Sequence, residues 1–218
     1  MKRAVGPEVW HRAQTGHLET WLGYAEKRVA EAPERIAAWR ALLETVEARA
    51  PTKPGERVLD IGCGLDTVLE FLPEVSRYTL DPLASQLVPM GLTPGIRHTA
   101  GVFESLPFPD QTFDRVFLLN VLDHVRAPAE GLAEIARVSQ PGAVLVVSVD
   151  TFAGRRYVAK RLHKWWGRMR GARTKHPWVF SVPALQRMLE STGFEPALPE
   201  RIPLAKPRRT LFVSRRRG

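Results

Sequence analysis

RVLDIGCGLDTVLEFLPEVSRYTLD, residues 57–81, is the stretch that decides the fold. A short apolar run at 58–61 is followed at once by glycines, and the apolar positions within 67–72 suit a helix packed on a sheet. A second short run, 77–80, ends on the carboxylate of Asp81. This order predicts a strand, a glycine turn, a helix and a second strand. Glycines let the backbone approach a ligand, and a carboxylate after the second strand can accept hydrogen bonds from ribose hydroxyls, so the stretch indicates a nucleotide site.

Two kinds of nucleotide site compete for this unit. A dinucleotide site requires the pattern G-x-G-x-x-G, and Thr67 occupies the third glycine position here. Asp60 lies two residues before Gly62, and a carboxylate at that point suits a ligand with a cationic amine better than a pyrophosphate, which it repels. The dehydrogenase interpretation is therefore the weakest of those considered.

On these residues the chain resembles the class I S-adenosylmethionine-dependent methyltransferases and, within them, the type-11 group. The resemblance covers about 58–150 and implies an α/β, Rossmann-like fold, with a seven-stranded, mostly parallel sheet and helices on both faces. It implies S-adenosylmethionine as the cofactor, with the first acid and glycines at its methionine part and the second acid at its ribose. The cofactor-binding residues that follow are Asp60, Gly62, Cys63, Gly64, Asp81, Pro82, Phe103, Glu104 and Asn120.

Two positions depart from the pattern of this family. Asp66 stands where the family often carries a further glycine, so the first loop is expected to differ locally. Val102 stands where relatives often carry an aspartate that contacts the adenine amine. Glu104, or the backbone groups of Phe103 and Glu104, would have to serve that purpose in this chain.

The N-terminal part is expected to be helical. Apolar residues at helical spacing predict one helix over 8–32 and a second after Pro33. We therefore divide the chain into an N-terminal helical cap, 1–54, and a methyltransferase domain, 55–218. In the family such helices commonly cover the substrate side, where pocket-lining side chains would be Trp10, His11, Trp21 and Tyr24. The alternative is that these side chains form an ordinary helix–helix core.

The remaining elements follow the strand–helix alternation of the family. Expected strands are 96–100, 112–120, 143–149, 195–201 and 208–213, and expected helices are 82–90, 130–138 and 182–193. Pro141 and Gly142 are expected to turn the chain before the fifth strand, and Ser181 to cap the last helix. We expect the last two strands to form an antiparallel edge pair and residues 215–217 to form a frayed basic tail.

The sequence NVLDHV, 120–125, follows the fourth predicted strand, at the edge where ligands bind in an open parallel sheet. Asp123 and His124 are the candidate catalytic residues, because a histidine can accept a proton from an oxygen or nitrogen acceptor near neutral pH. The alternative is a structural or cofactor-adjacent role, since a histidine is frequent here among type-11 enzymes with unrelated substrates. Methyl transfer can also proceed by holding donor and acceptor in line, without a dedicated catalytic residue.

Composition narrows the class of protein. The chain has 218 residues, of which 44% are hydrophobic and 25% charged, as in an ordinary globular domain. No apolar run approaches the ~20 residues that span a bilayer, and no signal-peptide core follows the first residues. The single cysteine, Cys63, excludes an intramolecular disulfide, and the six histidines lack zinc spacing, so we predict no metal. The expected location is the cytoplasm, free or peripheral at a membrane.

Charge is distributed unevenly along the chain. Residues 1–150 hold 15 Lys+Arg and 20 Asp+Glu, whereas residues 151–218 hold 17 Lys+Arg and 3 Asp+Glu. The segment 151–180 alone contains nine Lys/Arg and no acid, and carries several tryptophans. It is predicted to form a basic helical insertion that meets an anionic partner, either a ligand, a membrane surface or RNA. The alternative is a solvated basic face on a helix that covers the core.

Together these observations predict an S-adenosylmethionine-dependent methyltransferase whose acceptor is a small or lipid-linked molecule, with anionic character. One rival keeps the fold and makes the acceptor RNA. A second rival is a non-catalytic domain of the same fold that docks on an anionic membrane.

Overall fold

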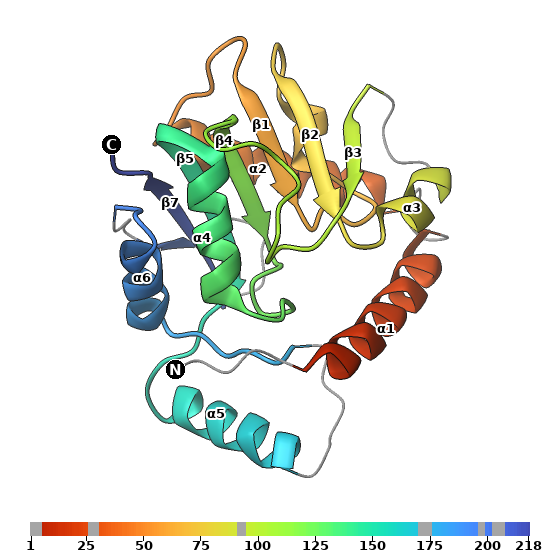
Figure 1. The fold of residues 1–218 in the computed structure, drawn as a ribbon, viewed down its shortest axis with the longest axis vertical. Coiled ribbons are helices and arrows are strands. Elements are labelled where there is room, and N and C mark those ends of the chain that lie inside the picture. Colours follow the sequence, from red (N-terminus) through yellow and green to blue (C-terminus); the bar gives the residue numbers. More distant parts are fainter. Residues whose placement is uncertain (1–5, 26–30, 91–94, 170–175, 196–198, 202–207) are drawn as a thin grey trace.

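The computed structural model describes residues 6–25, 31–90, 95–169, 176–195, 199–201 and 208–218 (Figure 1). The strands are β1 (Arg57–Ile61), β2 (Ser76–Asp81), β3 (Arg97–Ala100), β4 (Phe113–Leu119), β5 (Ser139–Asp150), β6 (Glu200–Arg201) and β7 (Arg209–Arg215). The α-helices are α1 (Pro7–Ala25), α2 (Ala32–Glu47), α3 (Ala84–Leu87), α4 (Pro128–Val138), α5 (Gly154–Met169) and α6 (Val182–Ser191). Two short 3-10 helices are η1 (Val68–Phe71) and η2 (Val88–Met90).

The strands form a single mixed sheet in the order β3-β2-β1-β4-β5-β7-β6. The first five strands are mutually parallel, and β7 runs antiparallel to both β5 and β6. The predicted α/β class and the predicted antiparallel edge pair are therefore confirmed. Among the described residues the seventh strand, β6, contains only two residues, and the other six strands form the body of the sheet.

The central strands are apolar because both faces of the sheet are covered, as expected for a parallel sheet. Side chains on one face pack against α4 and α6, and alternate side chains pack against α2 and η1. In β5, for example, Leu145 and Val147 belong to the first cluster, whereas Val144 and Val146 belong to the second. Figure 1 shows α4 and α6 in front of the sheet and α2 behind it. Because α2 shares a core with the sheet, the proposed division at residue 54 stays a prediction.

Of two local predictions, the first held only in part and the second was wrong. The segment 67–72 forms only the four-residue η1, because Pro73 follows directly and Leu72 before it is extended, at φ −97° and ψ 111°. The expected turn at Pro141 and Gly142 is instead a bulge inside the 12-residue β5. Gly142 has φ +79° there, a left-handed conformation that glycine adopts without a steric penalty.

The C-terminal strands also differ from expectation. The strand expected over 195–201 is limited to Glu200–Arg201, and 196–198 lie outside the described residues. The basic tail is not frayed, since Arg216 donates its backbone N–H to Ala143 at 2.8 Å and its guanidinium to the carbonyl of Ser139. Arg217 donates its backbone N–H to Gly193 at 2.9 Å. These hydrogen bonds fix the tail beside the start of β5.

Arg115 on β4 is the largest fully buried side chain of the described structure. Its guanidinium donates to Glu56 at 3.0 Å, to the Ala50 carbonyl at 3.0 Å and to the Pro51 carbonyl at 3.1 Å. These three partners belong to the segment between α2 and β1. One buried cation therefore joins the N-terminal helices to the centre of the sheet.

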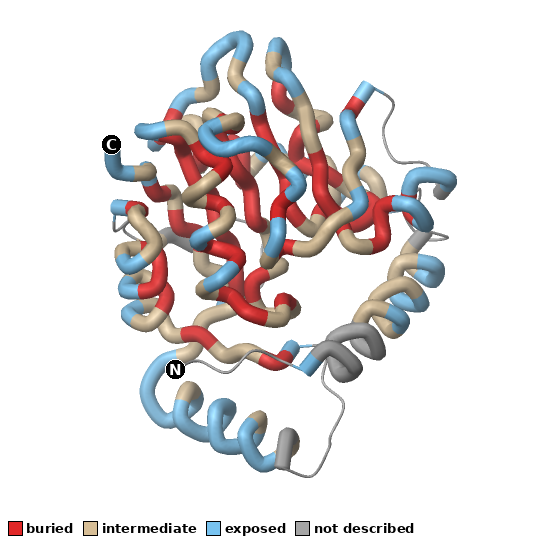
Figure 2. The backbone as a smooth tube through the Cα atoms, viewed as in Figure 1, coloured by how far each residue is buried: buried red, intermediate tan, exposed pale blue. Residues whose placement is uncertain are grey.

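The helix α5 lies apart from the two helical layers (Figure 1), and almost all of its described side chains are exposed (Figure 2). It occupies part of the predicted basic insertion at 151–180, of which 170–175 lie outside the described residues. Among the described residues, no helix is long and apolar enough to cross a membrane.

We expect Arg115→Met to lower the free energy of unfolding by about 3 kcal/mol, because the substitution leaves the largely buried Glu56 carboxylate without its cation. Urea denaturation followed by circular dichroism would measure the change. Arg40→Met on the exposed face of α2 is the matched control and should change stability by less than about 0.5 kcal/mol. Equal stability of the two variants would contradict a central role for the buried cation.

Candidate active site

A cavity of about 770 Å³ opens at the carboxyl ends of β1, β2 and β4 and is covered by α1 and α2. In an open parallel sheet this edge, beside the point where the strand order reverses, is the usual ligand site. The sequence-predicted residues that line it are Asp60, Gly62, Cys63, Asp81, Pro82, Phe103, Glu104, Asn120 and His124. Gly64 lies in the same loop as Gly62 but does not line the cavity. Trp21 and Tyr24 also line it, while the side chains of Trp10 and His11 lie outside the described residues.

The glycine loop depends on two left-handed residues, Gly62 at φ +71° and Gly64 at φ +60°. A Cβ atom on Gly62 would overlap the Val121 side chain, and one on Gly64 would overlap the indole ring of Trp21. Only glycine combines that backbone with so close an approach. The loop is therefore held between the segment after β4 and helix α1.

Asp60 is buried in the floor of the cavity and accepts a hydrogen bond from the Thr67 hydroxyl at 2.7 Å. Burial raises the pKa of the Asp60 carboxyl to about 7, the nearby charge of Asp81 adds to the increase, and the hydrogen bond from Thr67 opposes it. A cationic group beside Asp60 would favour its ionised form. The carboxylate is thus suited to an ammonium ligand.

Asp81 ends β2 and is also buried. Its two oxygens accept the backbone N–H groups of Leu83 at 2.8 Å and Gly64 at 3.1 Å. Burial raises the pKa of Asp81, and these two hydrogen bonds limit the increase. Each carboxylate oxygen has a second lone pair, so both can still accept a hydrogen bond from a ligand hydroxyl.

Cys63 lies between these carboxylates and is buried. Burial, together with the charges of Asp60 and Asp81, raises the pKa of the Cys63 thiol well above its ordinary value. A thiol with a raised pKa is a poor nucleophile. Cys63 therefore shapes the cavity and does not supply a reactive sulfur.

Asp66, the first departure from the family pattern, lies 3.4 Å from the guanidinium of Arg35 on α2. Both residues line the cavity. The acid that replaces a glycine therefore links the first loop to a helix that covers it. No sequence pattern indicated this pairing.

Glu104 occupies the region of the second departure, beside Val102. Its carboxylate accepts the backbone N–H groups of Arg126 at 2.6 Å and Ala127 at 2.8 Å, just before α4 begins. The carboxylate thus holds the loop between β4 and α4, a role that the sequence did not indicate. Phe103 packs so closely on α4 that a Cβ atom at Gly131 would overlap its ring.

Asn120 follows β4 and has φ +61°, a conformation that is uncommon for a residue with a side chain. Its backbone N–H donates to the Ser148 carbonyl at 2.8 Å, which holds the end of β4 beside β5. Strained backbone of this kind clusters at functional sites. Its place on the cavity wall agrees with that tendency.

Three histidines gather at the other end of the cavity, all of them lining it. The ring centroids of His17 and His124 are 4.7 Å apart, and those of His124 and His176 are 4.1 Å apart. Asp123 does not line the cavity, but its Oδ2 lies 2.7 Å from Nδ1 of His176. The predicted catalytic pair, Asp123 and His124, is therefore joined by two histidines from distant parts of the chain.

Asp123 is ionised in this cluster. Burial would raise its pKa, but the hydrogen bond from His176 and the charges of His124 and His176 together lower it. A hydrogen bond to an ionised Asp123 requires a proton on Nδ1 of His176. This is the arrangement by which a carboxylate orients a histidine base.

The segment that carries His176 is anchored next to Asp123. Trp178 donates its indole N–H to the Val125 carbonyl at 2.6 Å, and its backbone N–H lies 3.5 Å from the Asp123 carbonyl. Ligand atoms of Asp123, His124 and His176 fall within 4.8 Å of one another, a spacing that one divalent cation could bridge. The absence of a metal stays a prediction.

Sequence reasoning missed His17, His176 and Arg35 as cavity residues, and Thr67 as the hydrogen-bond partner of Asp60. His17 lies on the predicted N-terminal helix, and His176 lies beside Pro177 at the end of the basic segment. The sequence shows that both residues are histidines, but it does not show that their side chains line the same cavity. Thr67 was noted only as the residue that breaks the dinucleotide pattern.

Comparison with known proteins agrees with this geometry. A family model described as a methyltransferase domain matches residues 28–197. Demethylmenaquinone methyltransferase of Renibacterium salmoninarum is 36% identical over 116 residues, covering 50% of this chain and 46% of that protein. The tRNA U34 carboxymethyltransferase of Methylococcus capsulatus is 29% identical over 176 residues, covering 74% of this chain and 52% of that protein. The chain thus spans about half the length, or less, of the curated relatives it matches.

A solved structure shares the fold over the whole chain. The 1,6-didemethyltoxoflavin-N1-methyltransferase of Burkholderia thailandensis, with bound 1,6-didemethyltoxoflavin and S-adenosylhomocysteine, has a TM-score of 0.70 at 17% identity. The match covers 100% of this chain and 93% of that one. At this identity the similarity establishes the fold alone. The class I resemblance is confirmed, and the narrower type-11 label stays a prediction.

We expect Asp60→Asn to flatten the pH dependence of stability. The Asp60 carboxyl keeps its proton to about pH 7 in the folded state but loses it near pH 3.8 when unfolded. Rising pH therefore favours the unfolded state between pH 4 and 7, by up to about 1.4 kcal/mol per pH unit. Urea midpoints from pH 4.5 to 8 would show the wild type losing stability relative to Asp60→Asn up to pH 7, with a constant difference above it. Parallel curves would refute the raised pKa.

Proposed function

This chain belongs to the methyltransferase-domain family of S-adenosylmethionine-dependent enzymes, and on that premise we propose that it methylates a small-molecule or lipid-linked acceptor with anionic character. One observation carries the proposal: the buried carboxylates of Asp60 and Asp81 line the same cavity as His176, which is hydrogen-bonded to Asp123. The first two suit the cofactor. The second pair suits an acceptor that must lose a proton.

The cavity fits S-adenosylmethionine on chemical grounds. Asp60 would hold the ammonium group of its methionine part, and Asp81 would accept hydrogen bonds from its ribose hydroxyls. The loop of Gly62 and Gly64 gives the backbone room to lie close to the ligand, with Cys63 buried between them. The adenine would lie toward Phe103 and Glu104, with Pro82 and Asn120 on the neighbouring walls.

Bound S-adenosylmethionine supplies a methyl group made electrophilic by its sulfonium. The protein's part is to align donor and acceptor and to exclude water, which the covering helices α1 and α2 favour. His176 would take the proton that an oxygen or nitrogen acceptor loses, since Asp123 orients its ring. Asp123 is then a positioning residue, and His124 a neighbour that shapes the same end of the cavity. This assignment moves the proposed base from His124 to His176.

An RNA acceptor is the second candidate, and two observations favour it. The tRNA-modifying relatives match about three quarters of this chain, and residues 151–218 carry 17 Lys+Arg against 3 Asp+Glu. A non-catalytic role is disfavoured, because the chain belongs to an enzyme family and retains both cavity carboxylates. A cytoplasmic location, peripheral at a membrane, remains part of the proposal.

The cofactor assignment predicts micromolar binding of S-adenosylmethionine and S-adenosylhomocysteine, and none of NADH, by isothermal titration calorimetry. Asp81→Asn should weaken both adenosyl ligands at least 10-fold, because an amide removes one acceptor and the negative charge. Glu44→Gln, an exposed carboxylate-to-amide change on α2, should bind like the wild type. Unchanged affinity of Asp81→Asn, with its fold intact by thermal melting, would overturn the ribose assignment.

The acceptor assignment predicts transfer of a tritiated methyl group into a lipid or low-molecular-mass extract rather than into total tRNA. Because general-base catalysis contributes roughly 100-fold or more, His176→Ala should lower the transfer rate by about that factor and leave S-adenosylhomocysteine affinity unchanged. Asp123→Asn should move the acid limb of the pH–rate profile as well as lower the rate. Methylation of tRNA alone would replace the small-acceptor proposal, and a full rate in His176→Ala would exclude the base.

A further inference from the structure

The helix α5 has a composition unlike that of the other helices. Its sixteen residues, GRRYVAKRLHKWWGRM, contain six Lys/Arg and no acid. Its described side chains are almost all exposed, and the helix stands away from the body of the protein (Figures 1 and 2). Neither packing in the core nor pairing with acids on its own helix explains this composition.

An apolar stripe runs along one side of α5. It consists of Val158, Leu162, Trp165 and Trp166, which are 55%, 59%, 56% and 52% exposed. The spacing of four, three and one residues places them on one face of a helix. More than half of each of these side chains is exposed, and exposed apolar groups of this size commonly mark an interaction site.

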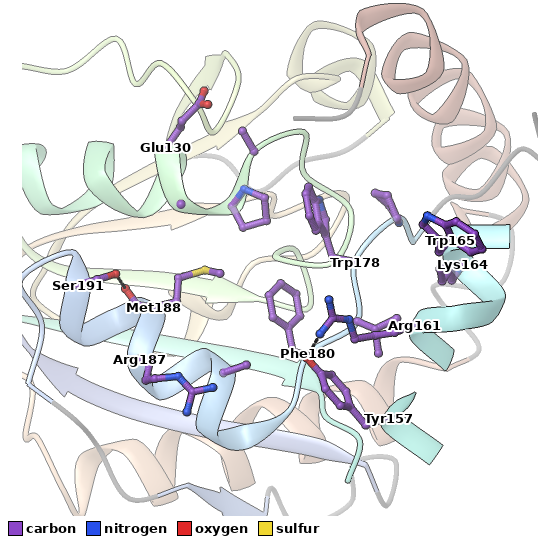
Figure 3. Close-up of a pocket in the computed structure, with 16 residues that line it drawn as sticks. Glu130, Tyr157, Arg161, Lys164, Trp165, Trp178, Phe180, Arg187, Met188 and Ser191 are labelled. Atoms are coloured by element: carbon purple, nitrogen blue, oxygen red, sulfur yellow. Dashed lines mark hydrogen bonds between the residues drawn. The ribbon is translucent and has the colours of Figure 1, made fainter. Parts of the chain in front are cut away.

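The side of α5 next to the stripe faces a cleft of about 490 Å³ between α4, α5 and α6 (Figure 3). Figure 3 shows Trp178 and Phe180 in the middle of this cleft, between α5 residues on one side and α6 residues on the other. Its cations are Arg161 and Lys164 on α5 and Arg187 on α6. The cleft therefore combines an aromatic centre with cations from two sides, and Glu130 is its one acid among the described lining residues.

We propose that α5 lies on an anionic membrane surface, with its apolar stripe at the acyl boundary and the adjoining cleft receiving a phosphate-bearing lipid headgroup. Basic helices with tryptophan and leucine on the opposite face bind the interface of a bilayer in this way. Each cation near an anionic leaflet adds to the attraction. The docking would bring a lipid-linked acceptor to the active site, but it does not depend on the methyl-transfer proposal.

Two other occupants explain the surface less well. RNA would use the cations, but it offers nothing to the aliphatic Val158 and Leu162. A second copy of the chain would place two helices of like charge against each other. Charge and apolar character together favour a lipid surface.

The test is flotation of the full chain with vesicles of phosphatidylcholine alone and of phosphatidylcholine with 30% phosphatidylglycerol, at physiological salt. We expect binding to the anionic vesicles only. Arg161→Gln with Lys164→Gln should weaken it roughly 30-fold, as the loss of two surface cations predicts. Val158→Ser with Leu162→Ser should weaken it about 10-fold. Arg40→Gln with Lys53→Gln removes the same charge from exposed sites elsewhere and should bind like the wild type.

Further measurements distinguish a membrane headgroup from a soluble anion and from RNA. Binding of inorganic phosphate by calorimetry without flotation would make the cleft a site for a soluble anion and overturn the docking. Retention on total tRNA that is lost in the Arg161/Lys164 variant, without flotation, would assign the surface to RNA and overturn it as well. If vesicle binding weakened equally in the Arg40/Lys53 variant, the effect would come from net charge alone, and the proposal of a specific docking surface on α5 would be wrong. Every variant should keep wild-type affinity for S-adenosylhomocysteine, so failure of docking would leave the cofactor assignment standing.

Discussion

The burial of Asp60 and Asp81 at one edge of the sheet is the constraint on which the rest of the site depends. Two carboxylates taken out of water side by side resist ionisation, and burial raises both pKa values. The Thr67 hydroxyl and the backbone N–H groups of Gly64 and Leu83 stabilise them in part. A cationic, hydroxyl-rich ligand would complete that stabilisation.

The covering helices are joined to this edge by specific polar contacts as well as by apolar packing. Trp21 of α1 lies against Gly64, and Arg35 of α2 pairs with Asp66 in the same loop. Deeper in the fold, Arg115 joins the segment after α2 to the central strand β4. The covering helices are thus in direct contact with the glycine loop.

The chain also separates two kinds of chemistry in space. The acids lie inside, at the carboxyl edge of the sheet, where a cationic donor is expected. The basic, aromatic surface of α5 and its cleft lies outside, beyond α4 and α6. Under the docking proposal, the charge asymmetry between residues 1–150 and 151–218 separates the cofactor side from the side that meets the membrane.

The sequence alone determined the fold class, the alternation of strands and helices along the chain, and the residues of the first loop. Glycine turns, apolar periodicity and an acid at a strand end are patterns of a few neighbouring residues, so they can be seen directly in the sequence. It also placed Asp123 and His124 at the correct edge of the sheet. Only the tertiary structure decided that His176 meets Asp123, that Glu104 holds Arg126 and Ala127, that the Arg216 tail is fixed, and that most described side chains of α5 are exposed. The hydrogen bonds among these join segments 22 to 77 residues apart in the sequence. No local pattern encodes which distant groups will share a buried environment.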